Sequence, residues 1–218
     1  MIARKRASDT DASIDARGQE VLQDEARFVH FPMSSHSATP LLTTARLRLR
    51  DWRDSDLPLF ARLNADPLVM AFMAKCLSRE ESDASVGRIR EHFDRHGFGL
   101  WAVENIGGAE FIGFTGLSIP RFTASFTPCV EVGWRFAADQ WGRGYATEAA
   151  RACLAFGFDQ LGLPEIVSFT TATNFRSRRV MERIGMTRDA ANDFEHPSLP
   201  AGHPLRPHVL YRALPRRT

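Results

Sequence analysis

Two glycines in the stretch DQWGRGYATEAA, residues 139–150, flank Arg143 and lead directly into an alanine-rich segment. Gly142 and Gly144 lack a Cβ atom, so a ligand can approach the main chain closely at both positions. The start of a helix presents unpaired N–H groups and a partial positive charge, which makes a glycine-rich loop before a helix a potential anion site. A phosphate group is the first ligand that this pattern suggests, although a glycine pair before a helix also occurs as a plain tight turn.

The segment before this loop carries a glycine of its own. Apolar residues alternate over 130–136 with Glu131, Gly133 and Arg135, which predicts a strand whose second face carries these three residues. A glycine inside a strand indicates a bulge or a close approach of a ligand or another backbone. Beyond the expected helix, EIVSFTT predicts a neighbouring strand, and Asn174 follows it. A phosphate at a helix start and an amide-bearing arm along a strand together fit coenzyme A.

Periodicity and capping signals place the elements that must position this loop. We expect strands at 47–51, 98–104, 111–119, 130–136, 165–171, near Met186 and at 208–214. We expect four helices: one capped by Ser55 or Asp56, one from Ser78 towards Arg95, one from Tyr145 to Phe158 and one from Asn174 to Ile184. The order β, α, α, β, β, β, α, β, α, β, β predicts the α/β class with a mixed sheet.

Composition narrows the class of protein. A chain of 218 residues with 44% hydrophobic and 25% charged residues and a net charge of +2 suits one globular domain and gives no reason to expect nucleic acid. Three cysteines without C-x-x-C spacing argue against a disulfide framework and favour the cytoplasm. No segment approaches 18 apolar residues, so we expect no membrane span. We expect an N-terminal extension at 1–40, in which Met33 is a candidate initiator, a domain at 41–214, and a tail at 215–218.

Three motifs in combination resemble those of the GNAT N-acetyltransferase superfamily: EVGWRF, WGRGYATEA and NFRSRRVMERIGM. The closer resemblance is to the branch of ribosomal-protein N-terminal (alanine) acetyltransferases and covers about 41–214. It implies a mostly antiparallel sheet with helices on both faces and a splayed central strand pair. It also implies acetyl-CoA as co-substrate, no metal, and an amine acceptor that is a small molecule, a peptide or a protein N-terminus. Nucleic acid and membrane are not expected as partners, and the chain is expected to be a monomer or a homodimer.

The resemblance also assigns residues to coenzyme A. The backbone N–H groups of six loop and helix residues would hold the pyrophosphate, namely Gly142, Arg143, Gly144, Tyr145, Ala146 and Thr147. Trp134, Arg135 and Phe136 would pair with the pantetheine arm, while Asn174 and Ser177 would contact the coenzyme beyond the second strand. Trp141 stands at the first loop position, where the superfamily usually has glutamine or arginine, and Met181 replaces a tyrosine that often acts as general acid.

Transfer of an acetyl group requires a neutral amine. A lysine amine with a pKa of about 10.4 is protonated at pH 7, whereas an α-amino group at about 7.7–8.0 needs less help. Glu131 is the candidate base, and a solvent-facing strand residue is the alternative. Ser177 is the candidate acid, since the ribosomal branch is thought to use a serine there, and a helix cap is its alternative. Tyr211 is a further donor candidate, with core packing favoured.

Other features leave alternatives open. The proline-rich stretch 194–208 carries His196, His203 and His208, which we interpret as loop histidines, and we expect this loop to cover the acceptor pocket. Four aromatic residues line that pocket or belong to the core, namely Trp52, Phe98, Trp101 and Trp134. A nucleotide-phosphate enzyme is disfavoured because G-x-x-x-x-G-K-[ST] is missing. A non-catalytic coenzyme-A or partner-binding module stays open because of Met181.

Overall fold

The computed structural model describes residues 39–215, and the expectations for the extension before residue 39, including Met33, lie outside this part. The strands are β1 (Leu42–Thr43), β2 (Leu47–Arg50), β3 (Leu100–Asn105), β4 (Gly113–Ser118), β5 (Glu131–Phe136), β6 (Ile166–Thr171), β7 (Thr187–Arg188), β8 (Phe194–Glu195) and β9 (Pro207–Ala213). The α-helices are α1 (Leu57–Ala65), α2 (Arg79–His96), α3 (Tyr145–Ala155) and α4 (Phe175–Arg183), with short helical turns η2 (Asp54–Asp56), η3 (Ala138–Gln140), η4 (Phe156–Gln160) and η5 (Ala190–Asn192).

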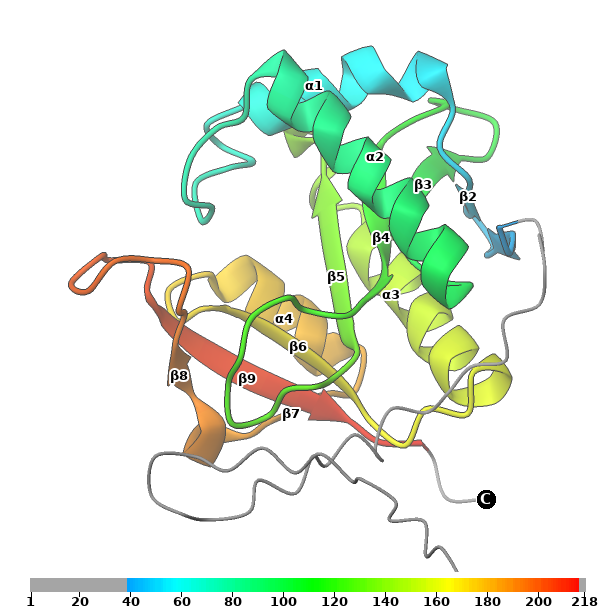
Figure 1. Cartoon of the computed structure of the whole chain (residues 1–218). Helices are drawn as coiled ribbons and strands as arrows, with labels where there is room; N and C mark the ends of the chain where they lie inside the picture. Colours follow the sequence, from blue (N-terminus) through cyan, green and yellow to red (C-terminus); the bar gives the residue numbers. More distant parts are fainter. Residues whose placement is uncertain (1–38, 216–218) are drawn as a thin grey trace, which may run out of the picture. The chain divides into compact units, whose positions relative to one another are not determined.

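In the described part the strands form one nine-stranded sheet in the order β1-β2-β3-β4-β5-β6-β9-β7, with β8 beside β9. Every pairing is antiparallel except that of β5 with β6, which is parallel and consists of the single pair Glu131 and Val167. Figure 1 shows β5 and β6 diverging from this point. The expected mostly antiparallel α/β sheet with a splayed central pair is therefore confirmed.

The sheet carries helices on both faces. Thr115 and Phe114 are neighbours on β4, so their side chains point to opposite faces. The Thr115 hydroxyl lies 3.9 Å from Cys153 Sγ on α3, which places α3 on one face. On the other face, Arg135, which pairs with Phe114, donates from Nη1 to Asn64 Oδ1 of α1 at 2.6 Å. Helix α2 packs beside α1, so α1 and α2 lie opposite α3, as Figure 1 shows.

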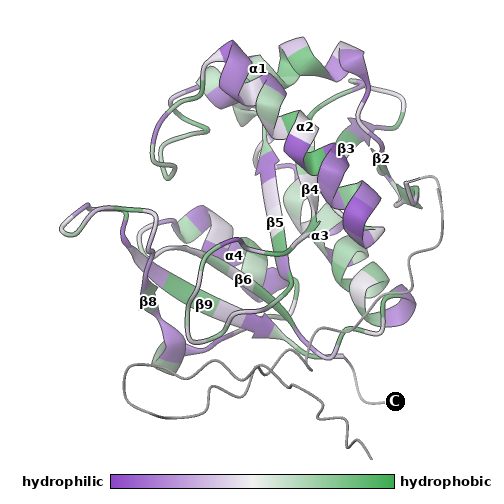
Figure 2. Ribbon diagram, in the orientation of Figure 1, coloured by the Kyte–Doolittle hydropathy of each residue, from purple (hydrophilic) through white to green (hydrophobic). Residues whose placement is uncertain are grey.

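Local sequence signals explain most helix ends. Ser78 Oγ accepts from the Glu81 amide and the Glu81 carboxylate accepts from the Ser78 amide, which confirms the capping box of α2. Figure 2 shows polar and apolar residues alternating along this helix, as expected for one that covers a sheet. Helix α3 ends at Ala155, before the expected Phe158, because the chain continues there as the π-helical turn η4. Asp56 precedes α1, yet its side chain caps no α1 amide.

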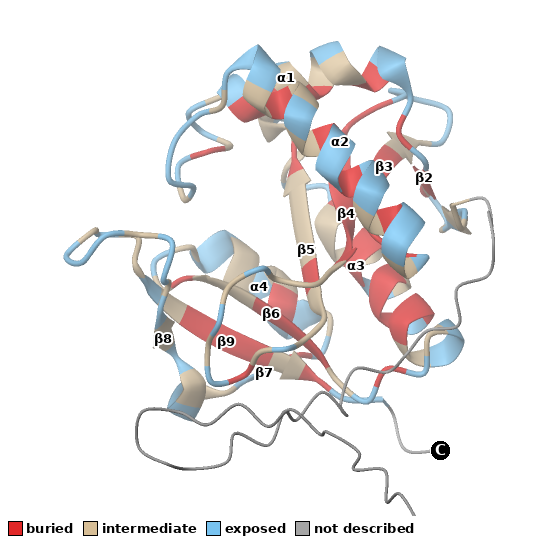
Figure 3. Cartoon of the chain, in the orientation of Figure 1, coloured by how far each residue is buried: buried red, intermediate tan, exposed pale blue. Residues whose placement is uncertain are grey.

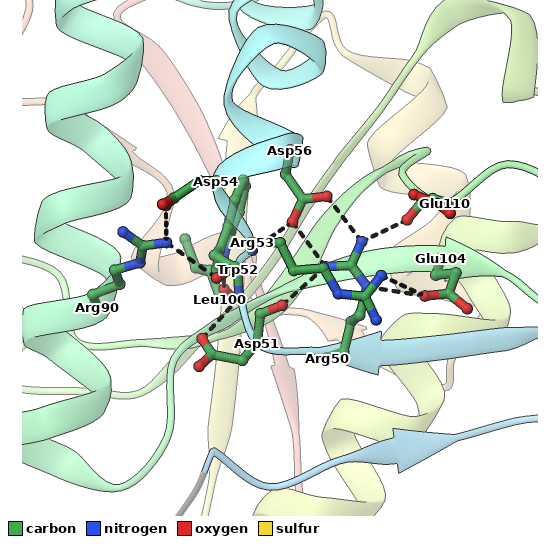
Figure 4. A network of polar contacts seen from close by, with 10 residues as sticks. All are labelled: Arg50, Asp51, Trp52, Arg53, Asp54, Asp56, Arg90, Leu100, Glu104 and Glu110. Atoms are coloured by element: carbon green, nitrogen blue, oxygen red, sulfur yellow. Dashed lines mark hydrogen bonds and ion pairs between the residues drawn. The ribbon is translucent and has the colours of Figure 1, made fainter.

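The side chain of Asp56 instead pairs with a buried arginine. Arg50 is only 5% exposed, and its Nη1 and Nη2 each donate to an Asp56 oxygen at 2.8 Å. Its Nε donates to Glu104 at 3.0 Å and Nη2 to the Glu110 carbonyl at 2.6 Å (Figure 4). In the sequence, Leu47 and Leu49 alternate with Arg48 and Arg50, a pattern that predicts a half-buried strand with Arg50 on its polar face. That expectation was wrong for Arg50, because α1 covers this face and brings a carboxylate with it.

The sheet and the inward sides of the helices form the core, which Figure 3 shows in red. Helix α3 buries one stripe of apolar residues, including Ala149, Ala150, Cys153 and Leu154. Strands β4 and β5 pair without interruption from Gly113–Phe136 to Ser118–Glu131. A bulge at Gly133 against β4 was one of two expectations, and this continuous register shows that none is present. The break in the sheet lies on the other side of β5, towards β6.

Candidate functional site

The glycine loop before α3 has the backbone that its sequence predicts. Gly142 and Gly144 have φ angles of +77° and +81°, in the left-handed region that glycine adopts without strain. Gly144 is the N-cap of α3 and offers no side chain to cap it. Within residues 39–215, no amide from Gly142 to Thr147 donates to another protein group. Six consecutive N–H groups at a helix start are thus available to an anion.

The loop is held from the side by the turn between β1 and β2. Glu148, in the first turn of α3, accepts from Thr44 Oγ1 at 2.6 Å and from Arg46 Nε at 2.7 Å. Arg46 Nη1 also donates to the Arg143 carbonyl at 3.0 Å, which ties the loop itself to this turn. Burial acts to raise the pKa of Glu148, but the hydrogen bonds from Thr44 and Arg46 outweigh it and lower the pKa. Nothing in the sequence pattern identified this contact across about a hundred residues.

Beside the loop lies a groove of about 650 Å³ that Thr147, Arg46, Arg151 and Arg183 help to line. Tyr145 is buried, and its hydroxyl accepts from Asn105 Nδ2 at 3.0 Å. Its ring therefore packs inward, while its backbone amide remains in the row of free N–H groups. The groove is basic on one side of the helix start.

Trp141 connects the loop to the first turn of α4. Its Nε1 donates to the Phe136 carbonyl at 2.9 Å, and the Arg176 guanidinium lies 4.3 Å from its ring centroid. This stacked contact is an attractive cation–π interaction. It brings the glycine loop and the start of α4 side by side across the divergence of β5 and β6. The sequence pattern assigned no role to Arg176, so this contact was missed.

Asn174 is the N-cap of α4. Its Oδ1 accepts from the Ser177 amide at 3.2 Å, and its Nδ2 donates to Thr170 Oγ1 at 3.0 Å and to Ser177 Oγ at 3.1 Å. The capping alternative considered for Ser177 therefore falls to Asn174. The Ser177 hydroxyl oxygen accepts, which leaves its own proton available to donate.

Tyr211 and Met181 lie in the core under α4. Tyr211 is 1% exposed, and its hydroxyl donates to Glu182 Oε1 at 3.0 Å and accepts from Arg178 Nε at 3.4 Å. Both partners belong to α4, so the hydroxyl is engaged in fastening that helix to β9. This environment fits the core-packing alternative for Tyr211. Met181 is equally buried and fills space beneath the same helix.

Glu131 lies where β5 and β6 part. A Cβ atom placed on Gly133 would meet Glu131 Oε1 at 3.9 Å, so the carboxylate leans along the strand over this glycine. Burial raises the pKa of Glu131 to about 8. Trp134 and Phe136 point to the α3 face, and Arg135 to the face of Glu131. From Val132 onwards β5 has no strand neighbour towards β6, which leaves main-chain groups open to an extended ligand.

The structure places the four aromatic residues and the proline-rich stretch whose roles the sequence left open. Trp52, Phe98 and Trp101 are at most 4% exposed and belong to the core, while Trp134 is half-buried. The stretch 194–208 contains β8 and folds back on β9, and it contributes no residue to the hollow under α2 described below. Phe194, His196 and His208 of this stretch join Phe122, Phe126 and Phe169 in an aromatic cluster on the other half of the sheet.

The described residues contain no group of three histidine, cysteine, aspartate or glutamate side chains that could hold a metal ion. Cys76, Cys129 and Cys153 are free. Burial raises the pKa of the Cys129 and Cys153 thiols to about 12, so neither is a ready nucleophile. No helix among residues 39–215 is long and apolar enough to cross a membrane.

Together these elements provide free backbone amides that can bind an anion, an open strand edge and a carboxyl group with a raised pKa.

Residues 46–187 match the family model described as Acetyltransferase (GNAT) domain. YkkB of Bacillus subtilis (strain 168) is 35% identical over 151 residues, 69% of this chain and 87% of YkkB. FsC-acetyl coenzyme A-N(2)-transacetylase of Aspergillus fumigatus is 34% identical over 161 residues, 69% of this chain and 66% of that protein.

Solved structures have the same fold. An acetyltransferase of the GNAT family from Bacillus anthracis aligns with a TM-score of 0.67 at 25% identity, covering 80% of this chain and 98% of that one. An acetyltransferase from Agrobacterium tumefaciens str. C58 aligns with a TM-score of 0.65 at 28% identity, covering 83% and 97% of the two chains.

Proposed function

Because the chain belongs to the GNAT acetyltransferase family, and is thus an acyltransferase that uses acetyl-CoA, we propose that it transfers the acetyl group to a primary amine of a small molecule, a peptide or a protein N-terminus. The observation that carries this proposal is the row of six free backbone N–H groups from Gly142 to Thr147. Such a row at a helix start fits a diphosphate, whose charge the helix dipole also favours.

The remaining parts of the site fit the rest of the coenzyme. The open edge of β5 beyond Val132 offers main-chain groups to the amides of a pantetheine arm, with Trp134 and Phe136 on the adjoining face. Asn174, Ser177 and Trp141 border the same opening from the side of α4 and the loop. When bound, acetyl-CoA supplies an activated thioester carbonyl, and holding it in line with the amine is the main task of the protein.

Glu131 is the proposed base. With a pKa near 8, its carboxylate gains the amine proton most readily in the slightly alkaline range, where an α-amino group is also largely neutral. During transfer, a bond forms between the amine nitrogen and the acyl carbon, and the bond from that carbon to sulfur breaks. Ser177 is the proposed donor of a proton to the departing sulfur, since its hydroxyl proton is free while Asn174 fixes its oxygen.

Two similarities to known proteins support the class of acceptor. The name of the Aspergillus fumigatus relative describes transfer to a nitrogen, which supports an amine acceptor. A protein N-terminus is the acceptor implied by the resemblance to the ribosomal branch. Two solved structures named as a putative ribosomal-protein-serine acetyltransferase and a ribosomal-protein-S5-alanine acetyltransferase share the fold, at 18% and 15% identity. Three free cysteines support a reducing compartment, and we place the activity in the cytoplasm.

Thiol release from acetyl-CoA in the presence of N-terminal peptides, polyamines and other amines tests the proposal, with product masses identifying the acetylated amine. We expect one or more amines to gain an acetyl group. Gly142→Asn should abolish most transfer, because asparagine tolerates φ above zero while its side chain blocks the amides. Gly162→Asn, at φ +63° in a distant turn, is the matched control. Transfer by Gly142→Asn at the wild-type rate would contradict the proposed site.

A further inference from the structure

A hollow of about 400 Å³ lies on the face of the sheet that carries Glu131, between α2 and strands β3 to β5. Its walls are apolar where Phe60, Ile89 and Phe114 contribute. Ser118, the residue paired with Glu131 across β4 and β5, also lines it. The proposed base therefore stands beside this hollow, on the face opposite α3.

The charged residues of the hollow all have the same sign. Arg88, Arg121 and Arg135 line it, and no aspartate or glutamate does. None of the three forms an ion pair with another residue in the part of the chain that the structure describes. Arg88 and Arg121 are exposed at the mouth, whereas Arg135 is half-buried. The hollow thus presents positive charge without a carboxylate to balance it.

Arg135 differs in this respect from an arginine in the same row of the sheet. Arg50, Ala102, Phe114 and Arg135 lie side by side across β2, β3, β4 and β5 and share one face. The charge of Arg50 is balanced by a bidentate ion pair with Asp56. Among residues 39–215, the guanidinium of Arg135 has only the neutral Asn64 amide oxygen at 2.6 Å and the Phe114 ring at 5.3 Å as partners.

A guanidinium without a counter-charge is costly to bury. Burial lowers the pKa of Arg135 to about 10, at which the group still carries its charge at neutral pH. An anionic group that entered the hollow would gain a charge-assisted hydrogen bond and would supply the missing counter-charge. Asn64 accepts from Nη1 of Arg135 and so orients the guanidinium, whose other N–H groups are left for the anion.

The two ends of the site are set by β5. Glu131 and Arg135 point to the same face four residues apart, which corresponds to ~13 Å between their Cα atoms. Gly133 between them carries no side chain, so the Glu131 carboxylate can lean over this position and towards Arg135. An acceptor lying along this face can place its amine at Glu131 and another group at Arg135. That spacing suits a molecule longer than a free α-amino acid, in which amine and carboxylate share one carbon.

We infer that the acceptor carries, besides its amine, an anionic group that Arg135 binds in this hollow, with Arg88 and Arg121 at the mouth. This inference rests on the proposed function and adds the class of acceptor to it. The anion is a carboxylate or a phosphate, both of which an arginine fork binds. Arg135 is accordingly a specificity-determining residue, and the Glu131 end of the site performs the chemistry.

Matched acceptors that differ only in charge test the inference. One pair is the glycyl-glutamate and glycyl-glutamine dipeptide amides, and the other is phosphoethanolamine and ethanolamine. We expect kcat/KM for the anionic member of at least one pair to exceed that of its neutral partner by about tenfold or more. The pair that shows the preference distinguishes a carboxylate from a phosphate. Arg135→Gln should bring the ratio towards one, mainly through KM, and Arg135→Lys should restore part of it.

Controls separate charge at this site from charge in general. Arg62→Gln removes an exposed arginine of α1 that forms no ion pair in the described part, and it should leave the ratio unchanged. Arg88→Gln and Arg121→Gln test the mouth should Arg135→Gln unfold, and each should lower the ratio. Equal kcat/KM for both members of both pairs in the wild-type protein would overturn the inference.

Calorimetry with coenzyme A distinguishes this failure from failure of the proposed function. If coenzyme A binds and the charge preference is missing, the class of acceptor is wrong and the proposed function stands. If coenzyme A binds and no probe is acetylated, each pair is titrated into the coenzyme-A-saturated protein to compare the affinities of its anionic and neutral members. Equal affinities within both pairs would overturn the inference. If coenzyme A does not bind, both the proposed function and the inference are overturned.

Discussion

Glu131 and Arg135 show how position on one strand gives two polar residues different surroundings. Both leave β5 on the face opposite α3, and neither has an ion pair in the described part. Glu131 lies at the point where β6 departs, and burial raises its pKa to about 8. Arg135 lies under α1, held by Asn64 and Phe114. The alternation of the strand predicted that they share a face. Their surroundings could not be predicted, because they come from α1, α2 and β4.

Replacement of Glu131 by glutamine tests its role as base. With a single acceptor of fixed amine pKa, we expect kcat/KM of the wild-type protein to rise as the pH passes through about 8, because the carboxyl group must lose its proton first. Glu131→Gln should lower kcat/KM at pH 9 by roughly 10²–10⁴-fold and keep only the pH dependence of the amine itself. A variant with the wild-type pH profile and a rate within about threefold would show that another group accepts the proton.

Elements near the site were predictable where short-range signals fix them. The capping box at Ser78 and the glycines of the loop before α3 correctly marked two helix starts. The two-residue strands β1 and β8 were missed, since each exists only through pairing with a distant strand. Long-range contacts such as Glu148 with Arg46 leave no periodic signal in the sequence, although they brace the loop that the motif revealed.

The buried ion pair of Arg50 with Asp56 fastens η2 and the start of α1 to the sheet above the proposed acceptor hollow. Its hydrogen bond to Asp56 is the main cause that raises the pKa of Arg50, against the effect of burial. Asp56→Ala leaves this charge buried with one fewer partner, so the free energy of unfolding should fall by about 3–5 kcal/mol in urea titrations. Asp83→Ala breaks an exposed pair with Arg79 and should cost less than about 1 kcal/mol. Equal losses for both variants would contradict this account of the network.

At the scale of the described domain, the sheet divides the proposed site into two sides. The free amides of the loop lie at the start of α3, and the hollow lies on the opposite face, under α1 and α2. Under the proposed function, the coenzyme would reach from one side to the other where β5 and β6 diverge. The motifs predicted this divergence only through resemblance to a family, because no local pattern in β5 or β6 shows that two parallel neighbours share a single pair.

Acid should loosen the domain through a half-buried histidine, His92. Burial lowers the pKa of His92, a residue that lines the hollow, and His96, Arg121 and Arg95 add to this effect. Its Nε2 accepts from the Ile119 amide at 3.2 Å, which requires the neutral ring. The unfolded chain therefore binds protons more readily than the folded one below pH ~6.5.

The free energy of unfolding should accordingly fall as the pH drops from about 6.5, and this loss should be absent above that pH. His92→Gln cannot titrate and should reduce the slope of melting temperature against pH between 7 and 5.5, while His203→Gln, which lies outside the hollow, serves as the control. An unchanged slope in His92→Gln would show that other groups cause the acid sensitivity.

The central claim is that the free amides from Gly142 to Thr147 bind the diphosphate of coenzyme A, and calorimetry of coenzyme A against pantetheine tests it most directly. Pantetheine lacks the diphosphate and serves as the matched ligand. We predict that wild-type protein and Gly162→Asn bind coenzyme A with the same affinity, and that Gly142→Asn weakens this binding by about tenfold or more without changing the affinity for pantetheine. No binding of coenzyme A by the folded wild-type protein, or equal affinity in Gly142→Asn, would contradict the claim.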